Sequence, residues 1–352
     1  MALRVGVVGA TGAVGSTILR VLAEREFALD ELRPLASARS AGKRLPFGTD
    51  EVEVQVLSEE TIGDLDLVIS SAGGTISSEW APRIIDAGAV VVDNTSYWRM
   101  HDQVPLVITE VNPEAADSHR GLVANPNCST MQALVALAPL QREVGIERML
   151  ISTYQSVSGT GQKAIEELRT QSRAVLEGET TEPEIYPHRI AFNVLPQVEV
   201  FVDGDDYTTE ERKMMAETRK ILGVSEAEMG ISATCARVPV FGAHSESINI
   251  QMREPIEPEE CRELLSAAPG VVVVDQPGEG RYPLATDATG RDEVLVGRIR
   301  RDPSHERCLN LWVVGDNLRK GAATNAVQVA ELLVKRDLVR VPDPSLTVGL
   351  DT

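Results

Sequence analysis

The sequence predicts an α/β protein with two domains: a doubly wound Rossmann-type domain, and an α+β domain built on a mixed sheet. Early in the chain, short β-branched runs alternate with helical segments, whereas strand-like runs with few helices between them dominate later. The 352 residues are also too many for one ordinary core. We expect the Rossmann-type domain over residues 1–128, completed by a helix over about 316–337, and the second domain over 129–315.

Composition restricts the class of protein. Hydrophobic residues make up 43% and charged residues 25%, and no apolar run is long enough to cross a membrane. The formal net charge of −19 argues against nucleic acid and anionic membranes as partners. The four cysteines contain no CxxC pair, so we expect no metal site, no disulfide framework and a cytoplasmic location. Because a strand pattern begins at Arg4, we expect no leader peptide.

The first element is a strand over Arg4–Val8 that runs directly into the glycine-rich turn Gly9–Gly15. Helical spacing of apolar residues follows the turn. In this context the glycines allow a pyrophosphate to approach backbone N–H groups at a helix start. The alternative is a glycine turn that serves packing alone. The predicted cofactor-binding residues here are Gly9, Thr11, Gly12, Ala13 and Val14.

The second strand, over Leu32–Ala36, is followed by Ser37, Arg39 and Ser40. An NAD site usually carries Asp or Glu at this strand end, to hold the ribose hydroxyls. A guanidinium flanked by hydroxyls suits a 2′-phosphate instead, so we predict NADP as the cofactor. The alternative is a solvated basic turn.

Further strands are expected over Val52–Leu57, Leu65–Ser71 and Ala89–Asp93, separated by helical or loop segments such as Ser77–Ala87. The small residues around Gly73 follow one of these strands and suit the sheet edge where a cofactor lies. Arg99 follows the next strand and is a candidate anion-binding residue. Read alone, it could equally be a surface arginine.

Cys128 lies in the segment 125–130, between an apolar run over Gly121–Ala124 and a helical pattern over Met131–Leu140. A cysteine at a helix start is exposed to the positive end of the helix dipole, which favours thiolate over thiol. Neighbouring backbone N–H groups could also hold an oxyanion that develops on a carbonyl under attack. The alternative is a small buried residue at a strand end.

The later part of the chain predicts the second domain. Helices are expected over Gln162–Leu176 and Thr208–Leu222, and Glu177–Pro187 is a polar excursion. A final helix over Gly315–Leu333 is expected to pack on the nucleotide domain. The expected extended segments are Arg148–Val157, Ala191–Val202, Ile231–Arg237, Ser245–Met252, Gly270–Val274 and Arg307–Val314.

Seven motifs occur in order along nearly the whole chain: GATGAVG, SARSAGK, NPNCST, YQSVSGTG, AFNVLPQV, RVPVFGAHSES and GDNLRKGAATNAVQ. Together they closely resemble the aspartate-β-semialdehyde dehydrogenase family. By this resemblance Cys128 is the nucleophile, Gln155 orients the substrate, and His244 is the general acid/base. The remaining four histidines lie in polar or loop contexts and are expected at the surface: His101, His119, His188 and His305.

The resemblance also assigns substrate-binding residues. Arg237 corresponds to the arginine that holds the substrate α-carboxylate, and Glu210 to the carboxylate that receives the amino group. Arg99 and Lys213 correspond to the residues that hold the phosphate, and Asn127 belongs with this substrate-binding set. The residue types suit these ligands. The guanidinium of Arg237 can pair with a carboxylate in a bidentate manner, and the positive charges of Arg99 and Lys213 suit a phosphate.

The cofactor-binding residues implied in the second domain are Ser158, Gly159 and Asn317, the last beside the nicotinamide. The implied reaction is NADPH-dependent reduction of L-aspartyl-4-phosphate to L-aspartate-4-semialdehyde and phosphate, through a cysteine thioester, in the biosynthesis of lysine, threonine, methionine and diaminopimelate. The family works as dimers or tetramers, so we expect a homodimer or homotetramer. Two alternatives stay open: an N-acetyl-γ-glutamyl-phosphate reductase, and a catalytically silent NADP-binding paralogue.

Overall fold

The computed structural model describes residues 3–340, and the first two residues, which bear on the expected absence of a leader, lie outside this range. The chain forms two compact units. The first comprises Met1–Asn127 and Ala322–Thr352, and the second comprises Cys128–Gly321. The polypeptide therefore leaves the first unit between Asn127 and Cys128 and returns to it after Gly321.

The first unit contains a six-stranded parallel sheet with the strand order β5-β2-β1-β6-β7-β8. Strands β1, β6 and β7 are mostly apolar and are buried on both faces over nearly their whole length, as central parallel strands are. The strands are β1 (Leu3–Val8), β2 (Leu29–Ala36), β5 (Gln55–Val56), β6 (Leu67–Ser70), β7 (Val90–Asp93) and β8 (Leu122–Ala124).

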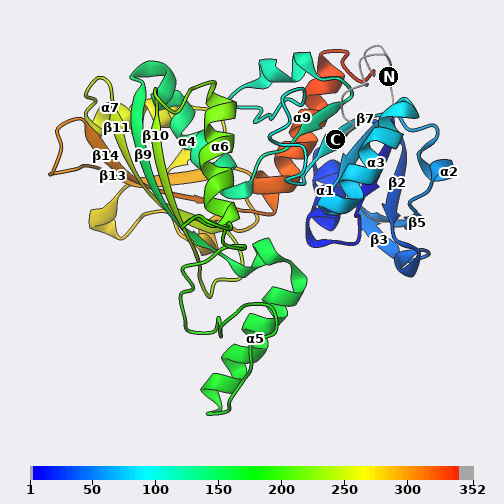
Figure 1. The fold of residues 1–352 in the computed structure, drawn as a ribbon, viewed down its shortest axis with the longest axis horizontal. Helices are drawn as coiled ribbons and strands as arrows, with labels where there is room; N and C mark the ends of the chain where they lie inside the picture. The colour runs from blue at the N-terminus through cyan, green and yellow to red at the C-terminus, as the bar shows by residue number, and fades with distance from the viewer. Residues whose placement is uncertain (1–2, 341–352) are drawn as a thin grey trace. The chain divides into compact units, whose positions relative to one another are not determined.

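Helices pack on this sheet and complete its core. The helices are α1 (Ala13–Glu24), α2 (Glu59–Ile62), α3 (Gly74–Asp86) and α9 (Asn325–Lys335). Helix α9 comes from the far end of the sequence, yet it packs against α1, β6 and β7 and shares their hydrophobic core (Figure 1). The buried α9 residues Val327 and Leu333 belong to that core.

One predicted strand is wrong in its extent. The segment Val52–Leu57 is divided between β4 (Asp50–Glu53), which forms a two-stranded hairpin with β3 (Arg44–Phe47), and β5, which pairs with β2. Its short alternating pattern fits one strand as well as two. The break falls at the buried Val54, where the chain changes pairing partner.

The second unit contains a six-stranded mixed sheet with the order β10-β9-β11-β14-β13-β12. Strands β9 and β10 are parallel, β11 is antiparallel to both β9 and β14, and β12 is parallel to β13. The strands are β9 (Ile146–Gln155), β10 (Gly230–Arg237), β11 (His244–Met252), β12 (Val271–Val273), β13 (Val294–Arg301) and β14 (Cys308–Gly315).

A helical layer contacts this sheet. Helix α4 (Cys128–Glu143) contacts both α6 (Thr209–Leu222) and α7 (Pro258–Ser266), and Figure 1 shows α6 beside β10, which it contacts. Helix α5 (Gln162–Leu176) extends away from the sheet together with the polar excursion (Figure 1). A separate small core that includes Leu168 and Ile190 holds this extension together.

Two features of the second unit, and the start of the helix that follows it, differ from the sequence prediction. Ala191–Val202 is not a strand, since its pairing is limited to isolated bridges such as Leu195 with Arg237, and its buried side chains pack toward α5. Strand β13 was missed, because a glycine and several arginines interrupt its apolar pattern. The expected final helix begins later, with a π-helical turn over Arg319–Thr324 before α9.

The predicted fold class is confirmed, with a parallel Rossmann-like sheet and a mixed α+β unit. Within residues 3–340, every helix is too short or too polar to span a lipid bilayer.

Candidate active site

The glycine turn between β1 and α1 has the geometry of a nucleotide-binding loop. Gly9 adopts a left-handed backbone with φ of +80°, and a Cβ placed there would lie 2.9 Å from the backbone nitrogen of Ala72. A Cβ at Gly15 would lie 2.2 Å from the carbonyl oxygen of Gly9. Thr11 and Gly12 are exposed, so the N–H groups at the start of α1 are accessible. The loop can therefore accept a phosphate group at close range.

The neighbouring strand ends carry the other predicted nucleotide contacts. Gly73 precedes α3 with φ of +92°, and the space around its missing side chain is open. Beyond β2, Ser37 and Arg39 are exposed and Ser40 is half-buried. Because β2, β1 and β6 are parallel neighbours, their carboxyl ends lie at one edge of the sheet.

Arg99 is not a surface arginine. Its side chain is buried, with Nε donating to the carbonyl oxygen of Asn125 at 2.9 Å and Nη2 donating to that of Asn94 at 2.8 Å. These contacts hold the guanidinium at the carboxyl end of the sheet, next to the segment that leads to the cysteine. Asn127 is buried in that segment.

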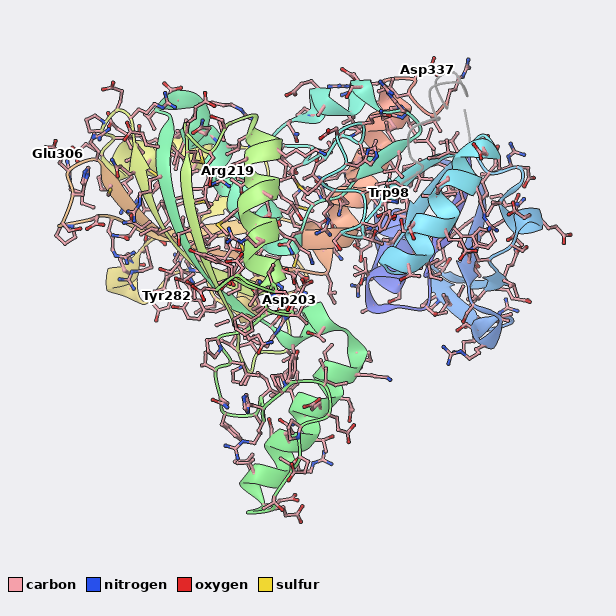
Figure 2. All side chains as sticks on the ribbon, viewed as in Figure 1. Trp98, Asp203, Arg219, Tyr282, Glu306 and Asp337 are labelled. Carbon is pink, nitrogen blue, oxygen red and sulfur yellow. The ribbon has the colours of Figure 1, made fainter. Side chains whose placement is uncertain are left out.

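Asp93 anchors the loop that carries Arg99. Its carboxylate accepts hydrogen bonds from Thr95 N at 2.9 Å and from Ser77 Oγ at 2.6 Å. Ser77 Oγ in turn accepts from the indole of Trp98 at 2.9 Å, and Figure 2 labels this buried tryptophan. Burial raises the pKa of Asp93, although the hydrogen bonds from Ser77 and Thr95 oppose that shift.

Cys128 is the first residue of α4 and is half-buried. The π-helical turn packs closely against it, because a Cβ placed on Gly321 would lie 2.8 Å from the Cβ of Cys128. The thiol therefore sits at the positive end of a sixteen-residue helix, in a position fixed by a backbone that carries no side chain at Gly321.

His244 begins β11 and is fully buried. The backbone N–H of Ser156 donates to its Nδ1 at 3.1 Å, and since a backbone nitrogen can only donate, Nδ1 carries no proton. The neutral ring therefore holds its proton on Nε2. Burial, reinforced by the positive charge of Arg237, lowers the pKa of His244 to about 3, so the ring is neutral near pH 7.

Arg237 ends β10 beside this histidine. It is buried, and its Nη1 donates to the carbonyl oxygen of Ser156 at 2.8 Å. Gly159 lies against both side chains, since a Cβ there would be 3.1 Å from Arg237 Nη1 and 3.3 Å from His244 Nε2. Any larger residue at position 159 would crowd the two groups that face the predicted reaction centre.

Gln155 and Glu210 form a second buried pair. Gln155 ends β9, Glu210 lies in the first turn of α6, and the amide of Gln155 donates to Glu210 Oε1 at 2.9 Å. Both side chains are buried. The pair presents an amide and a carboxylate from two different elements.

Asn317 ties several of these segments together. Its Oδ1 accepts from Ser156 Oγ at 3.1 Å, from Ser158 Oγ at 3.0 Å and from the backbone N–H of Ala243 at 3.1 Å. The segments before α5, β11 and α9 therefore meet at one amide oxygen. The second unit thus brings together predicted residues far apart in sequence: Gln155, Ser158, Gly159, Glu210, Arg237, His244 and Asn317.

Lys213, the other predicted phosphate-binding residue, forms an ion pair. Its Nζ lies 2.6 Å from both carboxylate oxygens of Glu199, a residue with a left-handed backbone at φ of +64°. The predicted phosphate-binding lysine is thus already paired with an anion.

The sequence interpretation overlooked residues that support this site. Ser156 lies inside a recognised motif, but its role in fixing the histidine ring follows only from the backbone contact. Gln132 and Glu246 were also overlooked, although Glu246 follows His244 by two positions on the same strand face. The expectation for His119 was wrong: it is buried, and its Nδ1 accepts the backbone N–H of Gly121 at 3.1 Å.

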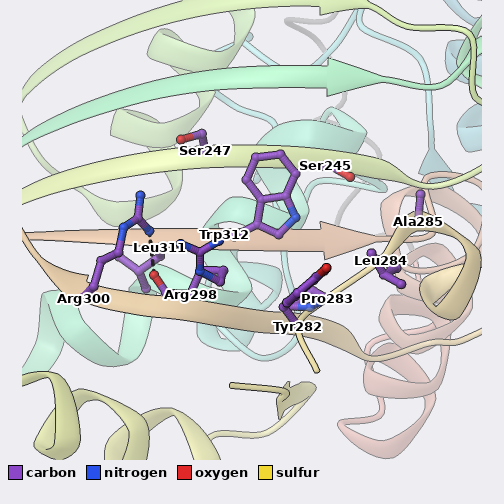
Figure 3. Close-up of a pocket in the computed structure, with 10 residues that line it drawn as sticks. All are labelled: Ser245, Ser247, Tyr282, Pro283, Leu284, Ala285, Arg298, Arg300, Leu311 and Trp312. Carbon is purple, nitrogen blue, oxygen red and sulfur yellow. Dashed lines mark hydrogen bonds between the residues drawn. The ribbon is translucent and has the colours of Figure 1, made fainter. Parts of the chain in front are cut away.

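A separate cavity of about 410 Å³ lies on the other face of the mixed sheet (Figure 3). Trp312 and the two arginines Arg298 and Arg300 line it, and the loop that carries Tyr282 forms its rim. None of the predicted site residues is among its lining residues. In the described part of the chain, His, Cys, Asp and Glu side chains form no group of three suited to hold a metal ion.

Two family models match the chain. Residues 4–119 match the model described as semialdehyde dehydrogenase, NAD binding domain, and residues 137–320 match semialdehyde dehydrogenase, dimerisation domain. The aspartate-semialdehyde dehydrogenase of Aquifex aeolicus is 53% identical over 96% of this chain and 100% of its own length.

Solved structures agree with this likeness. The crystal structure of aspartate semialdehyde dehydrogenase II from Vibrio cholerae complexed with ASA has a TM-score of 0.92 and 47% identity, covering 95% of this chain and 99% of its own. The Candida albicans aspartate semialdehyde dehydrogenase with NADP has a TM-score of 0.75 and 26% identity, covering 96% of this chain and 100% of its own.

Proposed function

The chain belongs to the aspartate-semialdehyde dehydrogenase family of oxidoreductases, and we propose that it reduces L-aspartyl-4-phosphate with NADPH, giving L-aspartate-4-semialdehyde, phosphate and NADP⁺. The observation that carries the proposal is the set of buried groups in the second unit: the neutral His244 and Arg237 lie against Gly159, and Gln155 pairs with Glu210.

NADP fits the first unit. Gly9 lets the turn pack closely against Ala72, the exposed Thr11 and Gly12 leave the start of α1 accessible to a pyrophosphate, and Gly73 leaves the start of α3 open. Arg39, exposed beyond β2 between Ser37 and Ser40, supplies a cation and hydroxyls for a 2′-phosphate. The Candida albicans relative with NADP supports the same choice. Bound NADPH supplies the hydride that reduces the thioester.

The substrate is held through its charges. Arg237 pairs with the α-carboxylate, since a planar guanidinium matches a carboxylate in a bidentate manner. Glu210 accepts the amino group, and Gln155, hydrogen-bonded to Glu210, orients the substrate beside it. Arg99 and Lys213 receive the phosphate, and Asn127 contributes next to Arg99.

Cys128 carries the covalent step. Its thiolate attacks the acyl carbon of the substrate, a C–S bond forms, and the C–O bond to phosphate breaks, with the electron pair leaving on the phosphate. The helix dipole at the start of α4 favours the thiolate. After the thioester has been reduced, the C–S bond breaks, the aldehyde leaves and the thiolate is restored.

His244 provides a hydrogen-bond donor for the substrate. With Nδ1 occupied by the Ser156 N–H, its Nε2–H points a hydrogen-bond donor toward the region beside Gly159. We propose that this donor hydrogen-bonds to the substrate oxygen and stabilises its negative charge while the tetrahedral species exists, and that the proton stays on Nε2 throughout, since its full transfer would leave an anionic ring.

The proposal is tested with the purified protein, L-aspartate-4-semialdehyde, phosphate and NADP⁺, by following nicotinamide absorbance. Phosphate-dependent reduction of NADP⁺ supports it. Turnover of N-acetylglutamate semialdehyde instead would assign the chain to the related reductase, and inactivity with both substrates would favour a silent NADP-binding paralogue.

We also propose that the protein is a cytoplasmic homodimer or homotetramer. The dimerisation-domain match covers the mixed sheet, and the face opposite α4 and α6 exposes Tyr154, whose ring lies 5.4 Å from that of Trp312. We place the subunit contact on this face. A Trp312→Arg variant should shift the mass in sedimentation analysis toward the monomer, and an unchanged mass would contradict that placement.

A further inference from the structure

We propose that Glu246 is a neutral carboxylic acid that positions His244 through the side chain of Gln132. The inference rests on the proposed role of His244, and it adds a positioning residue that contacts neither substrate nor cofactor. It comes from an acidic side chain whose surroundings supply no positive charge from a described residue.

Glu246 is sealed inside the second unit. It lies two residues after His244 on β11, where every second side chain faces the interior, and its exposed fraction is 0%. Its two carboxylate oxygens have no hydrogen-bond partner of standard geometry among residues 3–340. A buried carboxylate with neither a counter-charge nor a hydrogen bond is strongly unfavourable, so the group is expected to hold a proton instead.

The side-chain amide of Gln132 provides the acceptor for that proton. Gln132 Nε2 donates to the carbonyl oxygen of His244 at 3.1 Å, and because that oxygen can only accept, the orientation of the amide is fixed. Gln132 Oε1 is therefore an acceptor, and it too has no partner of standard geometry within the described chain. If Glu246 were ionised, its two oxygens and Gln132 Oε1 would all be acceptors, and none could bond to another. A protonated Glu246 can instead donate a hydrogen bond to Gln132 Oε1, so that both side chains have a partner.

The charged groups that face Glu246 agree with this state. Burial raises the pKa of Glu246 well above its usual range, and Glu210 from α6 adds to the shift. A hydrogen bond donated by Gln132 would oppose it, but the amide nitrogen of Gln132 donates to the carbonyl oxygen of His244 instead. From β10, the thiol of Cys235 also faces Glu246, and burial raises the pKa of that thiol. The two buried acidic side chains thus differ in their surroundings: Glu210 accepts a hydrogen bond from Gln155, whereas Glu246 has no such partner among residues 3–340 and stays neutral.

Gln132 links two parts of the site. It lies one helical turn after Cys128 on α4, and its amide holds the backbone of His244 on β11. Its position is tight, since a Cβ on Gly315 would lie 2.9 Å from Gln132 Oε1. Proton donation by Glu246 therefore stabilises the amide that sets the spacing between the helix of Cys128 and the backbone of His244.

Infrared difference spectroscopy tests the protonation state without turnover. Wild-type protein at pH 7 to 8 should show the C=O stretch of a protonated carboxylic acid that is missing from the Glu246→Gln variant and retained in the control Glu177→Gln, whose side chain is exposed. If the wild type lacks this band, the inference is wrong, even if the enzyme is fully active. A missing activity with the band present would instead contradict the proposed function alone.

Kinetics test the positioning role. Glu246→Gln keeps a neutral donor for Gln132 Oε1, so kcat and its pH profile should stay within about 2-fold of wild type, whereas Glu246→Leu should lower kcat by about 5- to 100-fold with little change in KM. Equal activity of the two variants, whether both high or both low, would overturn the inference. Should Glu246→Leu fail to fold, the Glu246→Gln profile and the infrared band still decide the question.

Discussion

A single methyl group at position 321 should displace the nucleophile. In the Gly321→Ala variant the new Cβ would start 2.8 Å from the Cβ and 3.3 Å from the Cα of Cys128. Ordinary contact begins at 3.4 Å, so the two carbons must separate by about 0.6 Å. The π-helical turn and the first turn of α4 are both well packed, and neither offers a flexible side chain that could absorb the shift.

The expected cost follows from that displacement. Inserting one methyl group into a packed region usually destabilises a protein by about 1–3 kcal/mol. A misplacement of this size at a reacting atom can lower the rate by up to about 100-fold. We therefore expect kcat to fall by about 10- to 100-fold while KM for phosphate changes little.

The assay compares Gly321→Ala with Gly278→Ala, where the space around the missing side chain is open. Turnover, the rate of thiol labelling at Cys128 and the thermal midpoint are measured for both. Wild-type kcat and labelling rate in Gly321→Ala would refute the reasoning, because the close contact with Cys128 would then have no functional consequence. A lowered thermal midpoint with unchanged kcat would show that the methyl group strains the fold without moving the thiol.

Three further predictions concern charge. Arg39→Asp should shift preference from NADP⁺ toward NAD⁺, and an unchanged ratio of kcat/KM for the two cofactors would exclude a 2′-phosphate contact. Glu199→Gln should lower the KM for phosphate by between about 1.5-fold and 5-fold, since an ion pair of this exposure is worth up to about 1 kcal/mol and holds Lys213 away from the phosphate. Unfolding curves should show that the wild-type free energy of unfolding falls as pH drops from 6.5 toward 3. In this range His244 is protonated in the unfolded chain but stays neutral in the folded protein. This contribution reaches about 5 kcal/mol for the shift from 6.5 to about 3, and a His244→Asn variant should have a flatter pH dependence over that range; parallel curves would contradict the neutral histidine.

Local patterns were sufficient for much of the fold. The helix over Gln162–Leu176 has the predicted bounds, because its apolar spacing and the glycine before it leave little ambiguity. The strand over Val294–Arg301 could not be found in the same way. It is defined by pairing with β12 and β14, and Gly297 is required there because a Cβ would lie 2.1 Å from the carbonyl oxygen of Val274.

The site was predictable as a set of residue types but not as a network. The motifs predict roles for Cys128 and His244, whereas the choice of protonated nitrogen in His244 depends on one backbone N–H of Ser156. The pairing of Lys213 with Glu199 likewise depends on how the chain between β9 and α6 folds. Such contacts join segments that are distant in sequence and leave no periodic signal.

The most direct test of the proposed function is phosphate-dependent reduction of NADP⁺ by wild-type protein and by Cys128→Ala, with L-aspartate-4-semialdehyde as substrate. Binding of NADP⁺ is measured in parallel as a control for folding. The proposal predicts turnover that requires phosphate in the wild type, and its loss in Cys128→Ala with NADP⁺ binding intact. Substantial turnover by Cys128→Ala would contradict the thioester route.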